Sequence, residues 1–212
     1  DLTAKIAIYR PNLEEYQLFL EYIDFTQAKA KYASSINAVL PKLKDDAAIK
    51  LIDAYHPLLY LNNIRNNERT IPQSLAMNRD CRIIIISGPN AGGKSITLKT
   101  IGLLQIMIQS GVLVPVNEMS EFGFFTQIFT DIGDNQSIEN HLSTYSYRLK
   151  QMSYFLKQAD ENSLLLVDEF GTGSDPELGG ALAEVFFEEF YERKSFGVFT
   201  THYTNIKLSA ES

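Results

Sequence analysis

Apolar side chains recur every three or four positions along the first forty residues. This spacing runs through residues 2–9 and again through residues 13–39, and it predicts helices. Pro11 should interrupt the pattern, after which Asn12 and Glu15 have the spacing of a capping box at the start of a second helix. We therefore expect residues 1–40 to be helical and to pack against a further part of a longer protein.

The pattern changes after residue 45, where shorter apolar runs alternate with helical stretches. Strands are expected at residues 49–55, 70–77, 83–86, 112–116, 122–131, 163–169 and 195–200. Helices are expected at residues 96–109, 143–159 and 177–193, and a loop or loose hairpin at residues 62–69. The four successive isoleucines at 83–86 indicate a strand buried on both faces, as in a parallel sheet. These elements predict an α/β fold with a sheet flanked by helices.

A glycine-rich segment directly follows the isoleucine strand and precedes a helix. It fits the phosphate-loop pattern G-x-x-x-x-G-K-[ST]. Its nucleotide-binding candidates are Gly88, Pro89, Asn90, Ala91, Gly92, Gly93, Lys94, Ser95 and Ile96. Small residues let backbone N–H groups close around a phosphate at the positive end of a helix. Lys94 would contact the β- and γ-phosphates of a nucleoside triphosphate, and the Ser95 hydroxyl would bind Mg²⁺.

A second apolar strand ends in two carboxylates, about seventy residues after the phosphate loop. Asp168 would hold the Mg²⁺ shell, and Glu169 would orient and deprotonate the attacking water. His202 follows the last expected strand and is a candidate sensor of the γ-phosphate. Ser143 either caps its own helix or offers an anion site at a helix N-terminus. Leu58 either packs on an adenine ring or fills the core.

Composition and charge narrow the class of protein. The chain has 212 residues, of which 45% are hydrophobic and 21% charged, and its net charge is −7. That charge argues against a free-standing nucleic-acid binder, which would show a basic surface. One cysteine permits no internal disulfide, and no apolar run is long enough to span a membrane. We expect a cytoplasmic protein with no membrane partner.

Four motifs together resemble the ATPase domain of the DNA mismatch repair MutS family. They are Gly-Pro-Asn-Ala-Gly-Gly-Lys-Ser at 88–95, Ser-Thr-Tyr at 143–145, Asp-Glu-Phe-Gly-Thr-Gly at 168–173 and Thr-His-Tyr at 201–203. The resemblance implies an ABC-type phosphate-loop NTPase domain over residues 45–212, preceded by the helical end of a lever and clamp region over residues 1–44. It also implies a homodimer with two composite ATP sites, where Ser143 reaches the γ-phosphate bound by the other subunit. Asn90 would help to hold that phosphate, and His202 would sense it.

Two segments are most similar to the bacterial paralogue commonly called the second MutS. They are residues 132–139 and 174–176, which differ from mismatch-repair MutS. Proteins of this branch lack the mismatch-reading domain, often carry a C-terminal nuclease domain, and have been linked to suppression of recombination and to rescue of stalled ribosomes. The implied function is ATP binding and hydrolysis in a dimeric machine that processes DNA or acts on ribosomes, including ribosomal RNA, through regions largely outside this chain.

Other functions stay open at this point. Mismatch-repair MutS proper is one, and a nucleotide-controlled dimerisation module with negligible turnover is another, although Glu169 argues against it. A phosphate-loop kinase is disfavoured by the adjacent pair of carboxylates. A head of the structural-maintenance-of-chromosomes type would need a Ser-Gly-Gly signature and coiled-coil arms. Neither DNA nor the ribosome is singled out as the partner.

Overall fold

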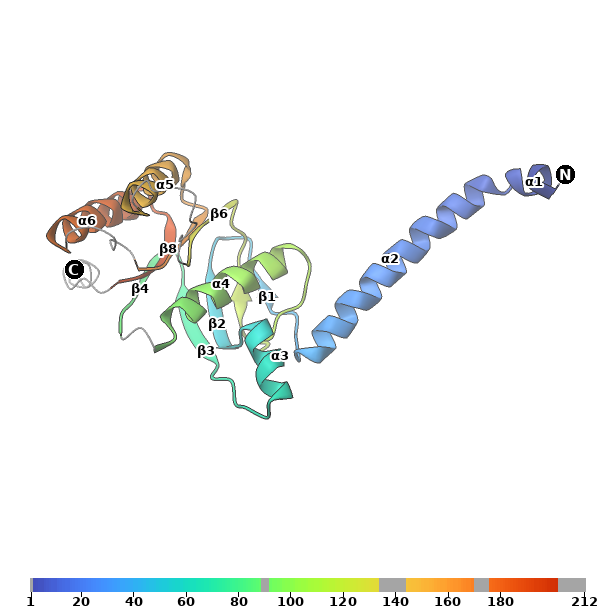
Figure 1. Ribbon diagram of the computed structural model, residues 1–212, viewed down its shortest axis with the longest axis horizontal. Coiled ribbons are helices and arrows are strands. Elements are labelled where there is room, and N and C mark those ends of the chain that lie inside the picture. The colour runs from blue at the N-terminus through green and yellow to red at the C-terminus, as the bar shows by residue number, and fades with distance from the viewer. Residues whose placement is uncertain (1, 89–91, 134–143, 170–175, 202–212) are drawn as a thin grey trace.

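The chain begins with a long helix that projects from an α/β body. The computed structural model describes residues 2–88, 92–133, 144–169 and 176–201. Helix α1 (Leu2–Ala7) leads into α2 (Arg10–Ser35), which extends away from the rest of the molecule in Figure 1. The expected break between two helices is present, but it lies at Ile8 and Tyr9, before Pro11. The capping box at Asn12 is wrong, because α2 begins at Arg10 and has no side-chain cap. Proline is tolerated in the first turn, where its missing N–H has no helical partner. The helix also ends at Ser35, earlier than expected.

Only the C-terminal end of α2 packs against the body. Ala33 and Ile36 are buried there, and the Lys29 ammonium group donates a hydrogen bond to the Gly111 carbonyl at 3.0 Å. Large apolar side chains earlier in the helix, such as Tyr22, are exposed. Among the residues that the structure describes, no helix has the combination of length and apolarity that crossing a membrane requires.

A small mixed sheet follows the helix. Its four strands, in spatial order, are β1 (Lys42–Leu43), β5 (Glu121–Phe122), β2 (Ile49–Ala54) and β3 (Gln73–Met77). Helix α3 (Pro57–Arg65) connects β2 to β3. The loop expected at residues 62–69 is therefore helical in its first half. The strand expected at residues 112–116 is also wrong, since its pairing is an isolated bridge between Val39 and Val114.

The second sheet is fully parallel. Its spatial order is β4 (Ile83–Ile86), β8 (Phe196–Thr200), β7 (Ser163–Val167) and β6 (Gln127–Asp131). The strand expected over residues 122–131 is thus two strands in two sheets. The division follows the backbone at Gly123, whose N–H binds the Ala48 carbonyl at 2.7 Å. A Cβ at Gly123 would lie 1.9 Å from the Asp46 carbonyl oxygen, so only glycine permits this approach.

The isoleucine strand is less buried than its sequence indicated. All four residues of β4 are half-buried, whereas every residue of β7 and β8 is buried. Within the described ranges β4 pairs with β8 alone. Its position at an edge of the sheet explains the lower burial. The sequence did not predict it, because an apolar run cannot distinguish a central strand from an edge strand.

Helices cover both faces of the parallel sheet. Helix α4 (Lys94–Gln109) packs in one cluster with Leu164 and Leu166 of β7, and this cluster also contains the small sheet. Helices α5 (Thr144–Gln158) and α6 (Pro176–Glu192) cover the other face, against Leu165 and Val167 (Figure 1). Strand β7 therefore buries both of its faces, as parallel strands between helices do. The expected sheet flanked by helices is confirmed.

Candidate functional site

Parallel strands bring distant parts of the chain to one edge of the sheet. Gly88 follows β4, Asp131 ends β6, Asp168 follows β7 and Thr200 ends β8. Because all four strands run in the same direction, their carboxyl ends lie together. In open α/β sheets this edge is where ligands bind.

Helix α4 starts at the same edge and supplies an N-terminus suited to an anion. Its N-cap, Gly93, has φ 82°, in the left-handed region that favours glycine. Lys94 is the first helical residue, is only 5% exposed, and donates from its ammonium group to the Gly88 carbonyl oxygen. Ser95 follows, at the end of the helix where unpaired N–H groups and the helix dipole favour negative charge. Gly93, Lys94 and Ser95 therefore lie at the start of α4, and their binding of phosphate stays a prediction.

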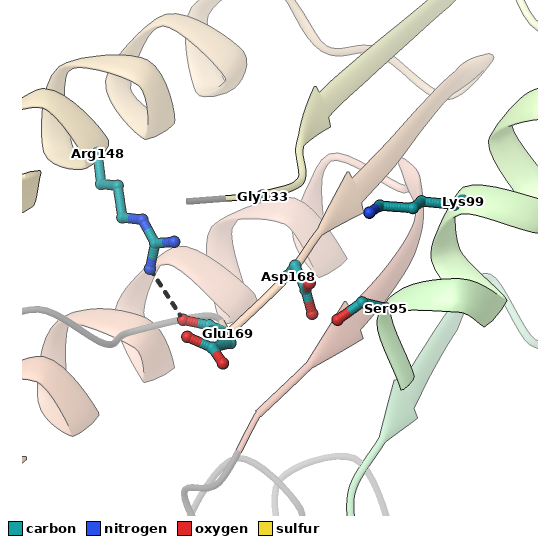
Figure 2. Close-up of a pocket in the computed structure, with 6 residues that line it drawn as sticks. All are labelled: Ser95, Lys99, Gly133, Arg148, Asp168 and Glu169. Atoms are coloured by element: carbon teal, nitrogen blue, oxygen red, sulfur yellow. Dashed lines mark hydrogen bonds between the residues drawn. The ribbon is translucent and has the colours of Figure 1, made fainter. Parts of the chain in front are cut away.

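A cavity of about 270 Å³ lies beside this helix end. Its lining residues come from α4, the carboxyl ends of β6 and β7, and α5 (Figure 2); they are Ser95, Lys99, Gly133, Arg148, Asp168 and Glu169. In Figure 2 the Ser95 hydroxyl and the Asp168 carboxylate point toward one another. The structure thus brings together residues that were predicted from two separate motifs: Ser95 from one, and Asp168 and Glu169 from the other.

Thr200 connects the two carboxylate residues. Its hydroxyl donates to Asp168 Oδ1 at 2.5 Å and accepts from the backbone N–H of Glu169 at 2.7 Å. Thr200 is fully buried and Asp168 is 7% exposed. Glu169 has φ 52°, a conformation that non-glycine residues seldom adopt and that is often found at functional sites. The hydroxyl therefore holds both the Asp168 side chain and the strained Glu169 backbone.

A buried ion pair lies on the other side of Glu169. Arg148 Nε is 3.8 Å from Asp131 Oδ2, and the two side chains are 15% and 3% exposed. Arg148 Nη1 donates to the Glu169 carbonyl oxygen at 3.4 Å (Figure 2). Burial raises the pKa of Asp131 above its ordinary value; Arg148 opposes this change and the nearby Asp168 adds to it.

The residues present fit Mg²⁺ bound together with a nucleotide. Mg²⁺ is commonly held by one or two carboxylates, phosphate oxygens and water, without a complete protein cage. Asp168 and Ser95 offer one carboxylate and one hydroxyl at the helix end that would face the phosphates. Within the described ranges, no group of three or more His, Cys, Asp or Glu side chains could hold a metal by itself. The donor set therefore suits a metal that arrives with its phosphate ligands.

Several predicted site residues cannot be placed in this way. Pro89, Asn90, Ala91, Ser143 and His202 lie outside the described residues, and their roles stay predictions.

Three other predicted site residues are described by the structure but do not line the cavity. Gly92 is exposed, Ile96 is half-buried, and Leu58 is 63% exposed on α3, outside the residues that line the cavity. The contact of Leu58 with adenine stays a prediction.

The sequence did not single out Lys99, Thr200, Asp131 or Arg148 as site residues. Lys99 could have been noticed, because it lies one helical turn after Ser95 and hence on the same side of α4. Asp131 and Thr200 end strands, so the rule that ligands bind at carboxyl ends could have flagged them. No local signal marks Arg148, whose role depends on where α5 packs.

Comparison with known families matches residues 84–212 to MutS domain V. The chain belongs to the MutS family. It is 42% identical over 207 residues to the Endonuclease MutS2 of Levilactobacillus brevis, covering 98% of this chain and 26% of the relative. It is 44% identical over 207 residues to that of Shouchella clausii, with the same coverage of 98% and 26%. For that of Clostridium kluyveri the identity is 43% over 188 residues, covering 89% and 23%.

These matches confirm the resemblance that the four motifs predicted. The chain spans about a quarter of the length of the curated relatives it matches.

Proposed function

We propose that this chain is the ATP-binding and ATP-hydrolysing module of a MutS-like, dimeric machine that processes nucleic acids. The observation that carries the proposal is the cavity in which Ser95, Asp168 and Glu169 meet beside the N-terminus of α4. A hydroxyl and a carboxylate for the metal, a second carboxylate for water and a helix end for phosphate are what hydrolysis of a nucleoside triphosphate requires. The same arrangement supports the ABC-type assignment of residues 45–212.

Each residue has a distinct task in this proposal. Lys94 would exchange its contact with the Gly88 carbonyl for the β- and γ-phosphates, which carry more negative charge. Asp168, oriented by Thr200, would hold the metal together with Ser95. Mg²⁺, when bound, would neutralise charge that develops on the phosphates. Glu169 would orient the attacking water and accept its proton.

Two substitutions test the assignment of binding and chemistry. Lys94→Ala should weaken ATP binding about tenfold to a hundredfold, since a hydrogen bond to a charged group contributes about 1.5–3 kcal/mol. Glu169→Gln should bind ATP normally and lose most turnover, because the amide keeps the shape and loses the base. Calorimetry and phosphate release would measure the two effects. The exposed Lys157 and Glu161 provide matched controls as Lys157→Ala and Glu161→Gln. Normal turnover in Glu169→Gln would contradict the proposed base, and negligible turnover in the unaltered protein would indicate a dimerisation module.

The composite dimer site can be tested by mixing inactive variants. Ser143 would complete the neighbour's site. Ser143→Ala would therefore impair the site of the neighbouring subunit, whereas Lys94→Ala would impair the phosphate loop of its own subunit. In a mixed head-to-tail dimer one site would carry both defects and the other neither, so part of the ATPase rate should return. Mixing Lys94→Ala with Glu169→Gln is the control, because both residues belong to one subunit's own site and each site of that mixed dimer would stay defective. No recovery in the first mixture, despite proven heterodimers, would count against this role of Ser143.

The activities of the whole protein are a further part of the proposal. Relatives that are named endonucleases are about four times as long as this chain, so we assign any nuclease activity, and contacts with branched DNA or the ribosome, to regions outside it. A role in anti-recombination or ribosome rescue would then use ATP hydrolysis here to drive changes elsewhere.

A further inference from the structure

The backbone of Glu169 is held from two sides in a strained conformation. Its N–H donates to Thr200 of β8 at 2.7 Å, and its carbonyl oxygen accepts from Arg148 of α5 at 3.4 Å. With φ at 52°, this residue stays in the left-handed region only if its surroundings enforce it. A change at either partner would therefore alter where the Glu169 carboxylate points.

Arg148 is itself anchored by a second strand. Its Nε lies 3.8 Å from the Asp131 carboxylate at the end of β6, and Asp131 is 3% exposed. The Asp131 carbonyl oxygen also accepts the Asp168 N–H at 2.8 Å. A guanidinium has donors on a rigid planar fork, so a single side chain can reach both Asp131 and the Glu169 carbonyl. The side chain thus connects α5 with the end of β6 and with Glu169, two residues after β7.

The position of Arg148 near the start of α5 couples this helix to Glu169. The helix begins at Thr144, and Arg148 lies one turn later, while Met152 and Phe155 fix the remainder of the helix in the core. Arg148 is the residue of α5 that lines the cavity (Figure 2). Movement of the first turn of α5 would reach Glu169 through Arg148.

We propose that Arg148, anchored by Asp131, is a positioning residue that sets the Glu169 backbone according to the position of the first turn of α5. The inference rests on the proposed ATPase function and deepens it, because it names the contact that regulates the base. A neighbouring subunit that bound the start of α5 would act on Glu169 through this side chain. We therefore assign the ion pair a role in geometry, since a buried ion pair is weak evidence for stability.

The test compares Arg148→Gln and Arg148→Lys with an exposed ion pair of similar geometry. Arg193 Nε lies 3.9 Å from Glu189 on α6, with both side chains more than 40% exposed, so Arg193→Gln is the control. Arg148→Gln should lower kcat by about tenfold or more and leave the affinity for ATP within about twofold. Arg148→Lys should keep the charge beside Asp131 and the unfolding midpoint, yet lose turnover, because an ammonium lacks the fork. Arg193→Gln should change neither quantity.

Asp131 should act only through Arg148. Asp131→Asn alone should reduce kcat, and in the Arg148→Gln background it should cause no further loss, which is the behaviour of two residues that work as a unit. Independent, additive losses of kcat would overturn the proposed chain of contacts.

Amide hydrogen exchange provides a readout that needs no ATP. In Arg148→Gln the Glu169 amide should exchange about tenfold faster, while amides in the centre of β7 should keep their protection, because only the local grip on Glu169 is lost. If the unaltered protein hydrolyses no ATP, the proposed function fails, and this measurement still decides the role of Arg148. Unchanged exchange at Glu169 together with unchanged kcat would overturn the inference.

Discussion

Replacing Thr200 with valine should destabilise the protein and disturb the metal site at once. Valine has nearly the shape of threonine but lacks the hydroxyl that binds Asp168 Oδ1 at 2.5 Å and the Glu169 N–H at 2.7 Å. Thr200 is fully buried, so water cannot easily take the place of the hydroxyl. Two polar partners are affected by one substitution.

The magnitude follows from what each partner loses. A buried N–H without an acceptor costs about 1–3 kcal/mol, and a hydrogen bond to a charged group contributes about 1.5–3 kcal/mol. The Asp168 carboxylate borders the cavity, where water can replace part of its lost bond, so its share falls at the lower end. We expect Thr200→Val to lower the free energy of unfolding by about 3 kcal/mol. Thr200→Ser keeps the hydroxyl, loses one methyl group and should cost about 1 kcal/mol.

Urea unfolding and ATP binding would measure these effects. With a slope of about 2 kcal/mol per molar urea, Thr200→Val should lower the midpoint by about 1.5 M and Thr200→Ser by about 0.5 M. Thr200→Val should also weaken Mg²⁺-dependent ATP binding, since Asp168 loses the group that orients it, whereas Thr200→Ser should not. Equal midpoints for the two variants would refute the reasoning, because they would show that losing the hydroxyl costs no more stability than losing the methyl group.

Two further predictions concern α3 and α4. His56 caps α3 by accepting the Leu59 N–H on Nδ1 at 3.4 Å, and burial, then the charge of Lys99, lowers its pKa from 6.5. Because the pKa is lowered in the folded state, folding favours the neutral imidazole of His56. Its contribution to stability is complete above pH 6.5 and is lost as the pH falls through the folded pKa. Asparagine can cap a helix at any pH, so the thermal unfolding midpoint of His56→Asn should rise relative to that of the unaltered protein as the pH falls below the folded pKa of His56. A difference between the two midpoints that does not vary with pH would exclude the cap. Gly102→Ala should lower the free energy of unfolding by about 1 kcal/mol, because a Cβ would lie 2.6 Å from Leu166 Cδ1. In a double-mutant cycle measured by denaturant unfolding, Leu166→Val should recover part of that loss.

Local sequence was sufficient for elements whose signals are local. The parallel strands β7 and β8 and the helices α4, α5 and α6 were predicted within a few residues, because apolar runs and helical spacing reflect burial on a sheet or a helix face. Prediction failed at α3 and at residues 112–131. In residues 112–131 the chain passes from the small sheet to the large one, and the pattern carries no record of the sheet to which a strand belongs.

The same division applies to the candidate site. The sequence by itself was sufficient for the membership of the MutS family, which the match to MutS domain V confirms. It also supplied the phosphate-loop candidates and the carboxylates Asp168 and Glu169, whose roles stay predictions, since these depend on residue types at short spacings that phosphate and metal chemistry demand. Only the tertiary structure decided that Thr200 and Arg148 hold Glu169 from opposite sides and that Asp131 anchors the arginine. These contacts join residues up to 31 positions apart. They exist because parallel pairing brings the carboxyl ends of separate strands to one edge of the sheet, which no local pattern encodes.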